Sequence, residues 1–368
     1  MSISTTAAVA ESAGSGFTIA EVQLDDPRPD EVLVRIVAAG LCHTDLGVAA
    51  GALPFPLPGV LGHEGAGIVE AVGSAVTSVA PGDHVLLSFT SCGQCASCRD
   101  GHPAYCATWL PANLLGGRRA DGTATITRDG QQLGGHFFGQ SSFARHALAD
   151  ARSVVKVDDD APLELLAPLG CGVQTGAGAI WNVLKPRPGA ALLITGAGAV
   201  GLSAVMAARL SPATTIIAAD RVPGRLKLAE ELGATHAFDT SSTDLGEAIA
   251  DITGGRGVDG VVETTGAVPV LRAGIDALAA RGTAVIIGAP AFGTEVSVDV
   301  NHMIAGRTVT GLTLGDSETQ TLIPVLACLV ASGDMPIGRI IRHYRFQDIG
   351  QAVGDVLDGS AIKPVLVL

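Results

Sequence analysis

Four cysteines stand close together within one stretch of the 368-residue chain, Cys92, Cys95, Cys98 and Cys106, with the spacing C-x2-C-x2-C-x7-C. Four thiolates at this spacing can surround one tetrahedral zinc ion and leave no position open, which describes a structural site. A disulfide cluster is disfavoured because the chain has an odd total of seven cysteines and no evident secretion signal. An iron–sulfur site is disfavoured because the fourth cysteine lies far downstream and no proline follows it. The spacing therefore predicts a closed zinc lobe over residues 90–110.

Three further potential metal ligands are scattered in the sequence. Cys42 is followed directly by a histidine, a threonine and an aspartate, an unusual group for packing alone. His63 precedes a predicted strand, and Cys171 lies between two glycines. Taken alone, a histidine at the start of a strand is more often structural than a ligand, and Cys171 is as compatible with an inert buried role as with metal binding.

A Gly-rich motif stands at the junction of a predicted strand and a predicted helix. The apolar strand Ala191–Thr195 runs directly into Gly196-Ala-Gly-Ala-Val-Gly201. In this context the first glycine permits the turn, the second lets the backbone approach a pyrophosphate, and the third lets the helix pack on the strand. Asp220 ends the next strand, 19 residues after the last glycine, where it would accept the ribose hydroxyls and repel a 2′-phosphate. The motif predicts NAD rather than NADP, although the neighbouring Arg221 keeps NADP open.

Length and composition indicate the elements that must position these residues. The chain exceeds one typical domain, and its composition of 47% hydrophobic and 16% charged residues suffices for large cores. We predict an α/β chain with a β-rich domain over residues 1–174, a doubly wound parallel sheet over 175–314, and a return to the first domain over 315–368. Such an insertion predicts a substrate cleft between the domains.

The predicted strands cluster or alternate β-branched residues, and the predicted helices show helical spacing. The strands are Phe17–Val22, Glu31–Ala38, Ile68–Val72, His84–Ser88, Ala191–Thr195, Thr215–Ala219, Val258–Glu263, Thr283–Ile287, Thr308–Leu312 and Pro364–Leu368. The helices are Leu202–Leu210, Arg225–Leu232 and Thr319–Ser332. We expect Cys328 to be a buried residue of the last helix.

Charge and hydropathy limit the partners and the compartment. The net charge of −13 argues against nucleic acid or an anionic membrane as partner. We see neither a signal peptide nor an apolar run long enough to span a membrane. Many cysteines in a chain without a secretion signal favour metal binding in a reducing cytoplasm.

The pattern Gly62-His63-Glu64-x2-Gly67-x5-Gly73-x2-Val76 resembles the signature of zinc-containing medium-chain alcohol dehydrogenases, and the cysteine lobe and the GAGAVG motif match that family too. The resemblance covers the whole chain. It implies a GroES-like catalytic domain and a Rossmann NAD-binding domain. The segments Gly40–Asp45, Phe137–Phe143 and Pro168–Gly178 most resemble the aryl (benzyl) alcohol dehydrogenase branch, whose close relatives act on geraniol, perillyl or cinnamyl alcohols.

The resemblance assigns roles to the scattered residues. It implies that Cys42, His63 and Cys171 hold a catalytic zinc and leave a fourth position for alcohol or water. Asp45 would orient the zinc histidine, Glu64 would lie behind the metal and exchange onto it, and Thr44 would start the proton relay. Many relatives carry a further relay histidine where this chain has Gly47, so the family's relay cannot be copied whole.

The resemblance also implies the residues that contact cofactor and substrate. Expected cofactor contacts are His43, Thr175, Gly196, Gly198, Ala199, Val200, Gly201, Asp220, Arg225, Ala289, Leu312, Leu314 and Lys363. His43 and Lys363 would contact the pyrophosphate, so NAD binding should weaken as pH rises through the range in which His43 loses its proton. Phe89, Phe137, Phe138 and Leu314 would line the substrate cleft, although the two adjacent phenylalanines could equally be core filler.

The expected reaction is oxidation of a primary aryl or allylic alcohol to its aldehyde by NAD+, with two zinc ions per chain. The first alternative is a formaldehyde dehydrogenase acting on a thiol adduct, which would favour cationic residues at the cleft rim. A non-enzymatic zinc-binding module is the second, but an open three-ligand site would have no purpose there. The family also implies a homodimer or homotetramer that pairs at an edge strand near Val285–Ile287 or Thr308–Leu312.

Overall fold

The computed structural model describes residues 3–368, which form two compact units. The first unit comprises Met1–Cys171, Glu318–Gly333 and Ile337–Leu368, and the second comprises Gly172–Ser317 and Asp334–Pro336. The predicted boundaries at 174/175 and 314/315 each lie three residues from these junctions.

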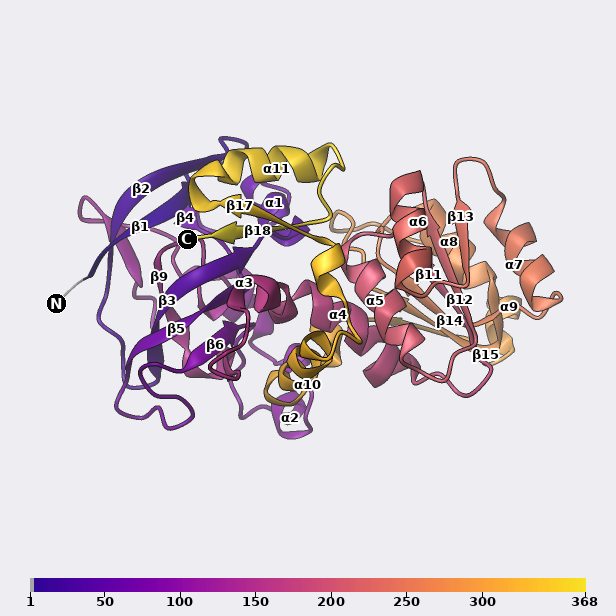
Figure 1. Cartoon of the computed structure of the whole chain (residues 1–368), viewed down its shortest axis with the longest axis horizontal. Helices are drawn as coiled ribbons and strands as arrows, with labels where there is room; N and C mark the ends of the chain where they lie inside the picture. Colours follow the sequence, from indigo (N-terminus) through magenta and orange to yellow (C-terminus); the bar gives the residue numbers. More distant parts are fainter. Residues whose placement is uncertain (1–2) are drawn as a thin grey trace. The chain divides into compact units, whose positions relative to one another are not determined.

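The first unit is built on two sheets of mostly antiparallel strands (Figure 1). Its strands are β1 (Ile3–Ala10), β2 (Phe17–Leu24), β3 (Glu31–Gly40), β4 (Gly59–Val60), β5 (Gly65–Val72), β6 (His84–Leu87), β7 (Ile126–Arg128), β8 (Gln131–Gln132), β9 (His146–Asp150), β10 (Val154–Lys156), β17 (Ile341–Arg345) and β18 (Lys363–Val367). One sheet has the order β4-β1-β2-β7-β8, and the other has the order β10-β6-β5-β3-β18-β17 with β9 also paired to β3.

The ends of three strands meet where the candidate ligands lie. In the second sheet β5 and β18 flank β3, and Gly40 at the end of β3 is the register partner of Val365. Its neighbour Ala39 faces Gly65, the first residue of β5. In Figure 1 the yellow β18 accordingly lies beside the indigo β3. This pairing brings the segments that follow β3, precede β5 and begin β18 together, although they are far apart in the sequence.

The helices of the first unit are short, apart from two near the C-terminus. They are α1 (His43–Ala49), α2 (Ala96–Arg99), α3 (Leu163–Leu166), α10 (Thr319–Ala331) and α11 (Ile349–Leu357). Cys328 lies on α10 as predicted, but it is exposed, so the predicted burial is wrong. The buried face of α10 carries Ile323 and Leu326. Cys328 lies two residues after Leu326, which is a rotation of about 200° around the helix axis and places Cys328 on the exposed face.

The second unit is a six-stranded parallel sheet in the order β13-β12-β11-β14-β15-β16. Its strands are β11 (Ala191–Thr195), β12 (Thr215–Asp220), β13 (His236–Asp239), β14 (Val258–Glu263), β15 (Leu278–Ile286) and β16 (Thr308–Gly311). Its helices are α4 (Gly172–Gly178), α5 (Ala199–Arg209), α6 (Pro223–Leu232), α7 (Leu245–Thr253), α8 (Val268–Asp276) and α9 (Val300–Ile304). In chain order this is the 3-2-1-4-5-6 arrangement of dinucleotide-binding sheets.

Both faces of this sheet are covered, which explains why its strands are apolar without alternation. Leu193 on β11 packs in a buried cluster with Ile249 of α7 and Ile275 of α8. The next residue, Ile194, faces the other way, because a Cβ on Gly201 of α5 would lie 3.5 Å from its Cγ2. The predicted α/β class, with a β-rich domain and a doubly wound parallel sheet, is confirmed. Within residues 3–368, no helix is both long enough and apolar enough to cross a bilayer.

Candidate active site

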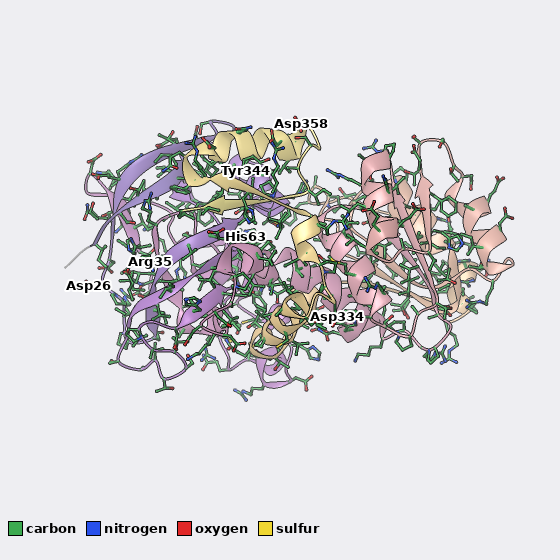
Figure 2. The ribbon with its side chains drawn as sticks, viewed as in Figure 1. Asp26, Arg35, His63, Asp334, Tyr344 and Asp358 are labelled. Atoms are coloured by element: carbon green, nitrogen blue, oxygen red, sulfur yellow. The ribbon has the colours of Figure 1, made fainter. Side chains whose placement is uncertain are left out.

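Four potential ligands gather beside the ends of β3 and β5 in the first unit. The Sγ atoms of Cys42 and Cys171, a ring nitrogen of His63 and a carboxylate oxygen of Glu64 all lie within 4.8 Å of one another. Cys42 immediately precedes α1, while His63 (labelled in Figure 2) and Glu64 immediately precede β5. Two sulfurs and one imidazole nitrogen are a donor set that suits catalytic zinc, with the carboxylate close enough to exchange.

Asp45 holds the loops that carry two of these ligands. Its Oδ1 atom lies 3.1 Å from Nδ1 of His63 and accepts the Gly62 amide at 3.0 Å. Its Oδ2 atom accepts the Cys42 amide at 2.9 Å. The side chains of Asp45 and His63 are fully buried. A carboxylate on Nδ1 fixes the histidine tautomer and aims Nε2 at the metal position.

The residues present fit a metal, because the remaining ring nitrogen of His63 lacks a partner. Nε2 is buried, and among residues 3–368 it has no hydrogen-bond partner. A buried nitrogen without a partner costs about 1–3 kcal/mol, so native proteins rarely keep one without use. Its place within the cluster of sulfurs supplies that use as a metal ligand.

The same contacts favour a thiolate at one of the two cysteines. A hydrogen bond from Cys171 lowers the pKa of Cys42 well below the ordinary thiol value, and it raises the pKa of Cys171. Burial opposes protonation of His63, but the Asp45 carboxylate outweighs it and raises the pKa of the imidazole. A thiolate is the form in which a cysteine binds a metal ion.

Lys363, which we expect to contact the pyrophosphate, forms a buried ion pair with Glu64. It is only 2% exposed, and its Nζ donates to both carboxylate oxygens of Glu64 at 2.9 and 2.8 Å and to the Leu41 carbonyl at 3.2 Å. These three bonds use all three ammonium donors. The Glu64 carboxylate therefore already neutralises this ammonium, and the contact of Lys363 with the pyrophosphate stays a prediction. Burial raises the pKa of Glu64 even though Lys363 opposes that shift.

An aromatic cluster surrounds the candidate ligand His63. The Phe138 ring stacks on it with centroids 4.5 Å apart, and the Phe137 ring meets it edge-on at 5.4 Å. Phe138 adopts a left-handed backbone with φ 52°, a costly conformation for a bulky residue and one that is found at functional sites. Trp109 packs edge-on against Phe138 at 5.7 Å. The two phenylalanines thus form an apolar wall beside the metal position, whereas Phe89 lines a separate hollow of about 220 Å³ with Cys98 and Arg152.

Two residues of this site carried no usable sequence signal. Gln140 donates to the His63 and Ser88 carbonyls at 3.0 and 2.7 Å and accepts the Gly65 amide at 3.1 Å. It therefore fixes the backbone on both sides of Glu64. The position of Trp109 in this site is also not predictable from the sequence, because an aromatic residue in an irregular loop is typical of packing alone.

The four clustered cysteines form the closed lobe that their spacing predicts. Their sulfur atoms all lie within 4.8 Å of one another, with Cys95 and Cys98 3.5 Å apart. The amide of Ala107 and then Cys98 lower the pKa of Cys95 to about 6, whereas burial raises that of Cys98 to about 12. The set offers four sulfurs and no open position, the arrangement of a structural zinc site.

The Gly-rich motif in the second unit has the geometry of a dinucleotide-binding turn. Gly196 has φ 89°, and a Cβ on Gly198 would meet nothing within 4 Å, so that backbone is open to a ligand. A Cβ on Gly201 would collide with the Gly196 carbonyl, which shows how closely helix and strand pack. The Asp220 carboxylate accepts the Ala197 amide at 2.6 Å, which fixes it beside the turn.

The other expected cofactor residues occupy varied positions. Ala199 and Val200 begin α5, and Arg225 lies in the first half of α6. In the second unit Thr175, Leu312 and Leu314 are buried, with Leu314 in a left-handed conformation of φ 48°, and Ala289 is exposed. His43 is the exposed first residue of α1. No cofactor contact is tested by these positions, and each stays a prediction.

Comparison with known proteins agrees with this geometry. The description "Alcohol dehydrogenase GroES-like domain" matches residues 28–159, and "Zinc-binding dehydrogenase" matches residues 199–328. A geraniol dehydrogenase from Castellaniella defragrans is 45% identical over 99% of this chain and 98% of its own length. An S-(hydroxymethyl)glutathione dehydrogenase from Synechocystis is 36% identical over 98% of each chain.

Solved structures share the fold along the whole chain. A zinc-binding-domain alcohol dehydrogenase protein from Burkholderia ambifaria has a TM-score of 0.98 and 52% identity, covering 100% of both chains. Benzyl alcohol dehydrogenase from Acinetobacter calcoaceticus has a TM-score of 0.96 and 42% identity over 100% of this chain and 99% of its own. A zinc-binding dehydrogenase from Sinorhizobium meliloti, bound to NADP, has a TM-score of 0.81 and 28% identity over 100% of both. The chain belongs to the zinc-binding alcohol dehydrogenase family.

Proposed function

We propose that the protein oxidises primary aryl or allylic alcohols to aldehydes with NAD+, in a reversible reaction. The observation that carries the proposal is the buried, unpartnered Nε2 of His63, which lies among two sulfurs and beside a phenylalanine wall. A zinc ion held there would act as a Lewis acid that lowers the pKa of a bound alcohol, and NAD+ would accept the hydride.

The residues of the chain divide the remaining work. Cys42, His63 and Cys171 would hold the metal, and Asp45 would keep His63 in the ligating tautomer. The Thr44 hydroxyl lies 3.8 Å from Cys42 Sγ, so it is close enough to the metal position to take the proton of the alcohol. Phe137 and Phe138 would exclude water from one side of this position.

The aromatic wall supports an aryl or allylic substrate. Flat unsaturated groups pack well against phenylalanine rings, and each added apolar contact in such a pocket contributes about 1–3 kcal/mol of discrimination. Two similar proteins carry the names geraniol dehydrogenase and benzyl alcohol dehydrogenase. These names and the wall point to the same class of alcohol.

The proposal includes two zinc ions per chain and NAD+ as cofactor. Two separate ligand clusters support the metal count, one open and one of four cysteines. Asp220 supports NAD+, because a carboxylate at the ribose would repel a 2′-phosphate. Its side chain is held near the turn by the Ala197 amide, so it cannot easily move aside.

The proposed assembly is a homodimer or homotetramer in the cytoplasm. Of the two edge strands predicted, Val285–Ile287 is wrong because β15 lies between β14 and β16, whereas β16 is an edge. Phe292, Val300 and Ile304 precede β16 in the chain and are 78%, 70% and 76% exposed. Exposed apolar residues of this kind support subunit pairing. Free cysteines throughout residues 3–368 support a reducing compartment.

The test is initial-rate kinetics with benzyl alcohol, cinnamyl alcohol, geraniol, hexanol and ethanol, each with NAD+ and NADP+, plus formaldehyde with glutathione. We expect kcat/KM for the aryl and allylic alcohols to exceed that for ethanol by about a hundredfold, which is about 2.7 kcal/mol of transition-state binding. Equal turnover of ethanol and benzyl alcohol would refute the substrate class. Turnover of formaldehyde with glutathione alone would favour the thiol-adduct reaction. Metal analysis should find two zinc ions per chain.

A further inference from the structure

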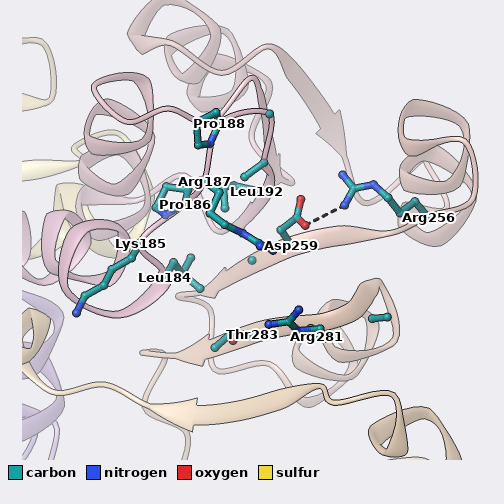
Figure 3. A pocket seen from close by; sticks show the side chains of 14 residues that line it. Leu184, Lys185, Pro186, Arg187, Pro188, Leu192, Arg256, Asp259, Arg281 and Thr283 are labelled. Atoms are coloured by element: carbon teal, nitrogen blue, oxygen red, sulfur yellow. Dashed lines mark hydrogen bonds and ion pairs between the residues drawn. The ribbon is translucent and has the colours of Figure 1, made fainter.

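We propose that the second unit carries a binding site for a small phosphate-bearing molecule, formed by Arg187, Arg256 and Arg281. Figure 3 shows these residues around a hollow of about 560 Å³. That volume lies within the range of small-molecule sites, roughly 300–1,000 Å³. The site is additional to the proposed cofactor and metal sites.

The hollow lies at the N-terminal ends of the parallel strands, whereas the cofactor motif follows the C-terminal end of β11. Ala190 and Leu192 line it at the start of β11, and Asp259 lines it at the start of β14. The GAGAVG motif follows the other end of β11. A strand of five residues spans about 16 Å. The hollow and the GAGAVG motif are therefore separate binding positions.

The lining is cationic in a chain that is otherwise acidic. Four of its 14 residues are Lys or Arg and one is acidic, whereas the whole chain has 23 Lys and Arg residues among 368 and a net charge of −13. Like charges gathered in one hollow repel one another, so their presence together raises the energy of the empty site. An anion placed among them would relieve this repulsion.

Among residues 3–368, one of the three guanidinium groups, that of Arg256, forms an ion pair with a side chain, while Arg187 contributes through its charge to the lowered pKa of the same carboxylate, Asp259. Arg256 donates to Oδ1 of Asp259 at 2.9 Å, and the other Asp259 oxygen accepts the Ala191 amide at 2.8 Å. Both oxygens of the single acid are thus used to hold Arg256 in place. Within residues 3–368 the guanidinium groups of Arg187 and Arg281 donate no hydrogen bond. Guanidinium forks of this kind match phosphate oxygens in a bidentate manner.

The backbone holds Arg281 and Arg187 in defined positions. Arg281 has φ 64°, a left-handed conformation that glycine would adopt without strain, and its amide is bound to the Ala305 carbonyl at 3.0 Å. Arg187 stands between Pro186 and Pro188, whose fixed φ angles limit the movement of the segment. A strained residue retained in place of glycine is consistent with a role for its side chain.

Leu184 and Leu192 supply an apolar part of the lining. The Leu184 and Leu192 side chains pack on Gly260, where a Cβ would lie 2.9 Å from each. A ligand that enters meets the cationic side chains of the lining, and the single carboxylate of the lining already accepts two hydrogen bonds. A phosphate group with a small organic body suits this arrangement, whereas a neutral or cationic molecule does not.

The test is calorimetric titration of the full-length protein with inorganic pyrophosphate at about 50 mM salt, where screening is weak. The protein is first saturated with NAD+, so that the Gly-rich turn is occupied and cannot bind the probe. The variants are Arg187→Ser and Arg281→Gly, and the matched control is Lys227→Ser, which removes an exposed cation of the same unit outside the hollow. Citrate serves as a polyanion without phosphate.

We expect one pyrophosphate per chain and a Kd weakened about tenfold or more in each arginine variant, with Lys227→Ser unchanged. Arg281→Gly should fold normally, because glycine suits the left-handed backbone, and circular dichroism checks this. No binding of pyrophosphate to the NAD+-saturated wild type, or equal weakening in Lys227→Ser, would overturn the site. Citrate that binds as tightly as pyrophosphate would overturn the assignment to a phosphate-bearing ligand.

Discussion

The buried ion pair of Glu64 and Lys363 offers a direct test of how the candidate active site is held together. The perturbation is Lys363→Met, which keeps a long unbranched side chain and removes the charge. The pair joins residues 299 positions apart, with N–O distances of 2.9 and 2.8 Å and side-chain exposures of 2% and 0%. The variant removes the ammonium that pairs with the buried Glu64 carboxylate.

The expected loss of folding stability follows from the burial of the ion pair rather than from its N–O distances. Breaking a buried pair by removing one partner costs about 3–5 kcal/mol, because the remaining charge stays desolvated. The matched control is Lys156→Met, which breaks a Lys–Asp83 pair of 2.6 Å whose lysine is 52% exposed. Exposed pairs contribute about 0–1 kcal/mol. The double variant Glu64→Gln/Lys363→Met should recover a large part of the loss, since neither member of the pair then carries a buried charge.

The assay monitors the unfolding of the first unit alone. The chain has two tryptophans, Trp109 in the first unit and Trp181 in the second. In a Trp181→Phe background, urea unfolding followed by tryptophan fluorescence therefore reports the unit that contains the pair, which avoids a two-state treatment of the whole chain. Equal losses in Lys363→Met and Lys156→Met would refute the reasoning, as would a double variant no more stable than Lys363→Met.

Three further predictions follow from the site and its surroundings. Asp45→Asn should weaken zinc at the His63 site about 10–100-fold in chelator competition, while the zinc of the cysteine lobe stays bound as an internal reference. Burial and then a hydrogen bond to Asp355 raise the pKa of Tyr344 to about 12, so its contribution to stability is complete below about pH 10 and is lost as pH rises towards 12. Urea unfolding at pH 9, 10 and 11 should therefore show a steeper decline for the wild type than for Tyr344→Phe. Asp220→Ala should lower the ratio of kcat/KM for NAD+ to that for NADP+ by about tenfold or more, and an unchanged ratio would remove its role in cofactor choice.

The features predicted from sequence are those encoded locally. The strand Ala191–Thr195 has its predicted bounds, and the Gly196–Gly201 turn follows it, because a strand, a tight turn and a helix each leave a pattern within about 20 residues. The four-cysteine lobe is likewise encoded by the spacing of residues within one short stretch of the sequence. The scattered ligands Cys42, His63 and Cys171 are not encoded locally. Their residue types are also compatible with packing, and only the family resemblance assigns the three to one metal site.

The features that were missed depend on pairing between distant strands. Lys363 reaches Glu64 because β18 pairs with β3, and no periodicity in the last segment indicates its neighbour. Gln140 likewise satisfies backbone groups of two other segments, and a lone glutamine carries no pattern. Strand β1 (Ile3–Ala10) is not among the predicted strands, because its β-branched residues do not alternate regularly and three of its eight residues are alanines. Tertiary context therefore fixed what local propensity left undetermined.

The family resemblance does not supply a complete route for the proton in this chain. Gly47, at the position of the relay histidine in many relatives, lies on α1, and a Cβ there would stand 3.1 Å from Leu53 Cδ1. With no side chain at that position, the Thr44 hydroxyl, 3.8 Å from Cys42 Sγ, has to pass the proton onward without it.

Thr44→Val should therefore lower kcat about 10²–10⁴-fold, the usual contribution of a positioned proton-transfer group, while Thr44→Ser keeps the hydroxyl and most of the rate. Both variants should retain zinc and the same unfolding midpoint, which separates a chemical role from a structural one. If Thr44→Val turns over alcohol at the rate of Thr44→Ser, the proton leaves by a path that does not involve this hydroxyl.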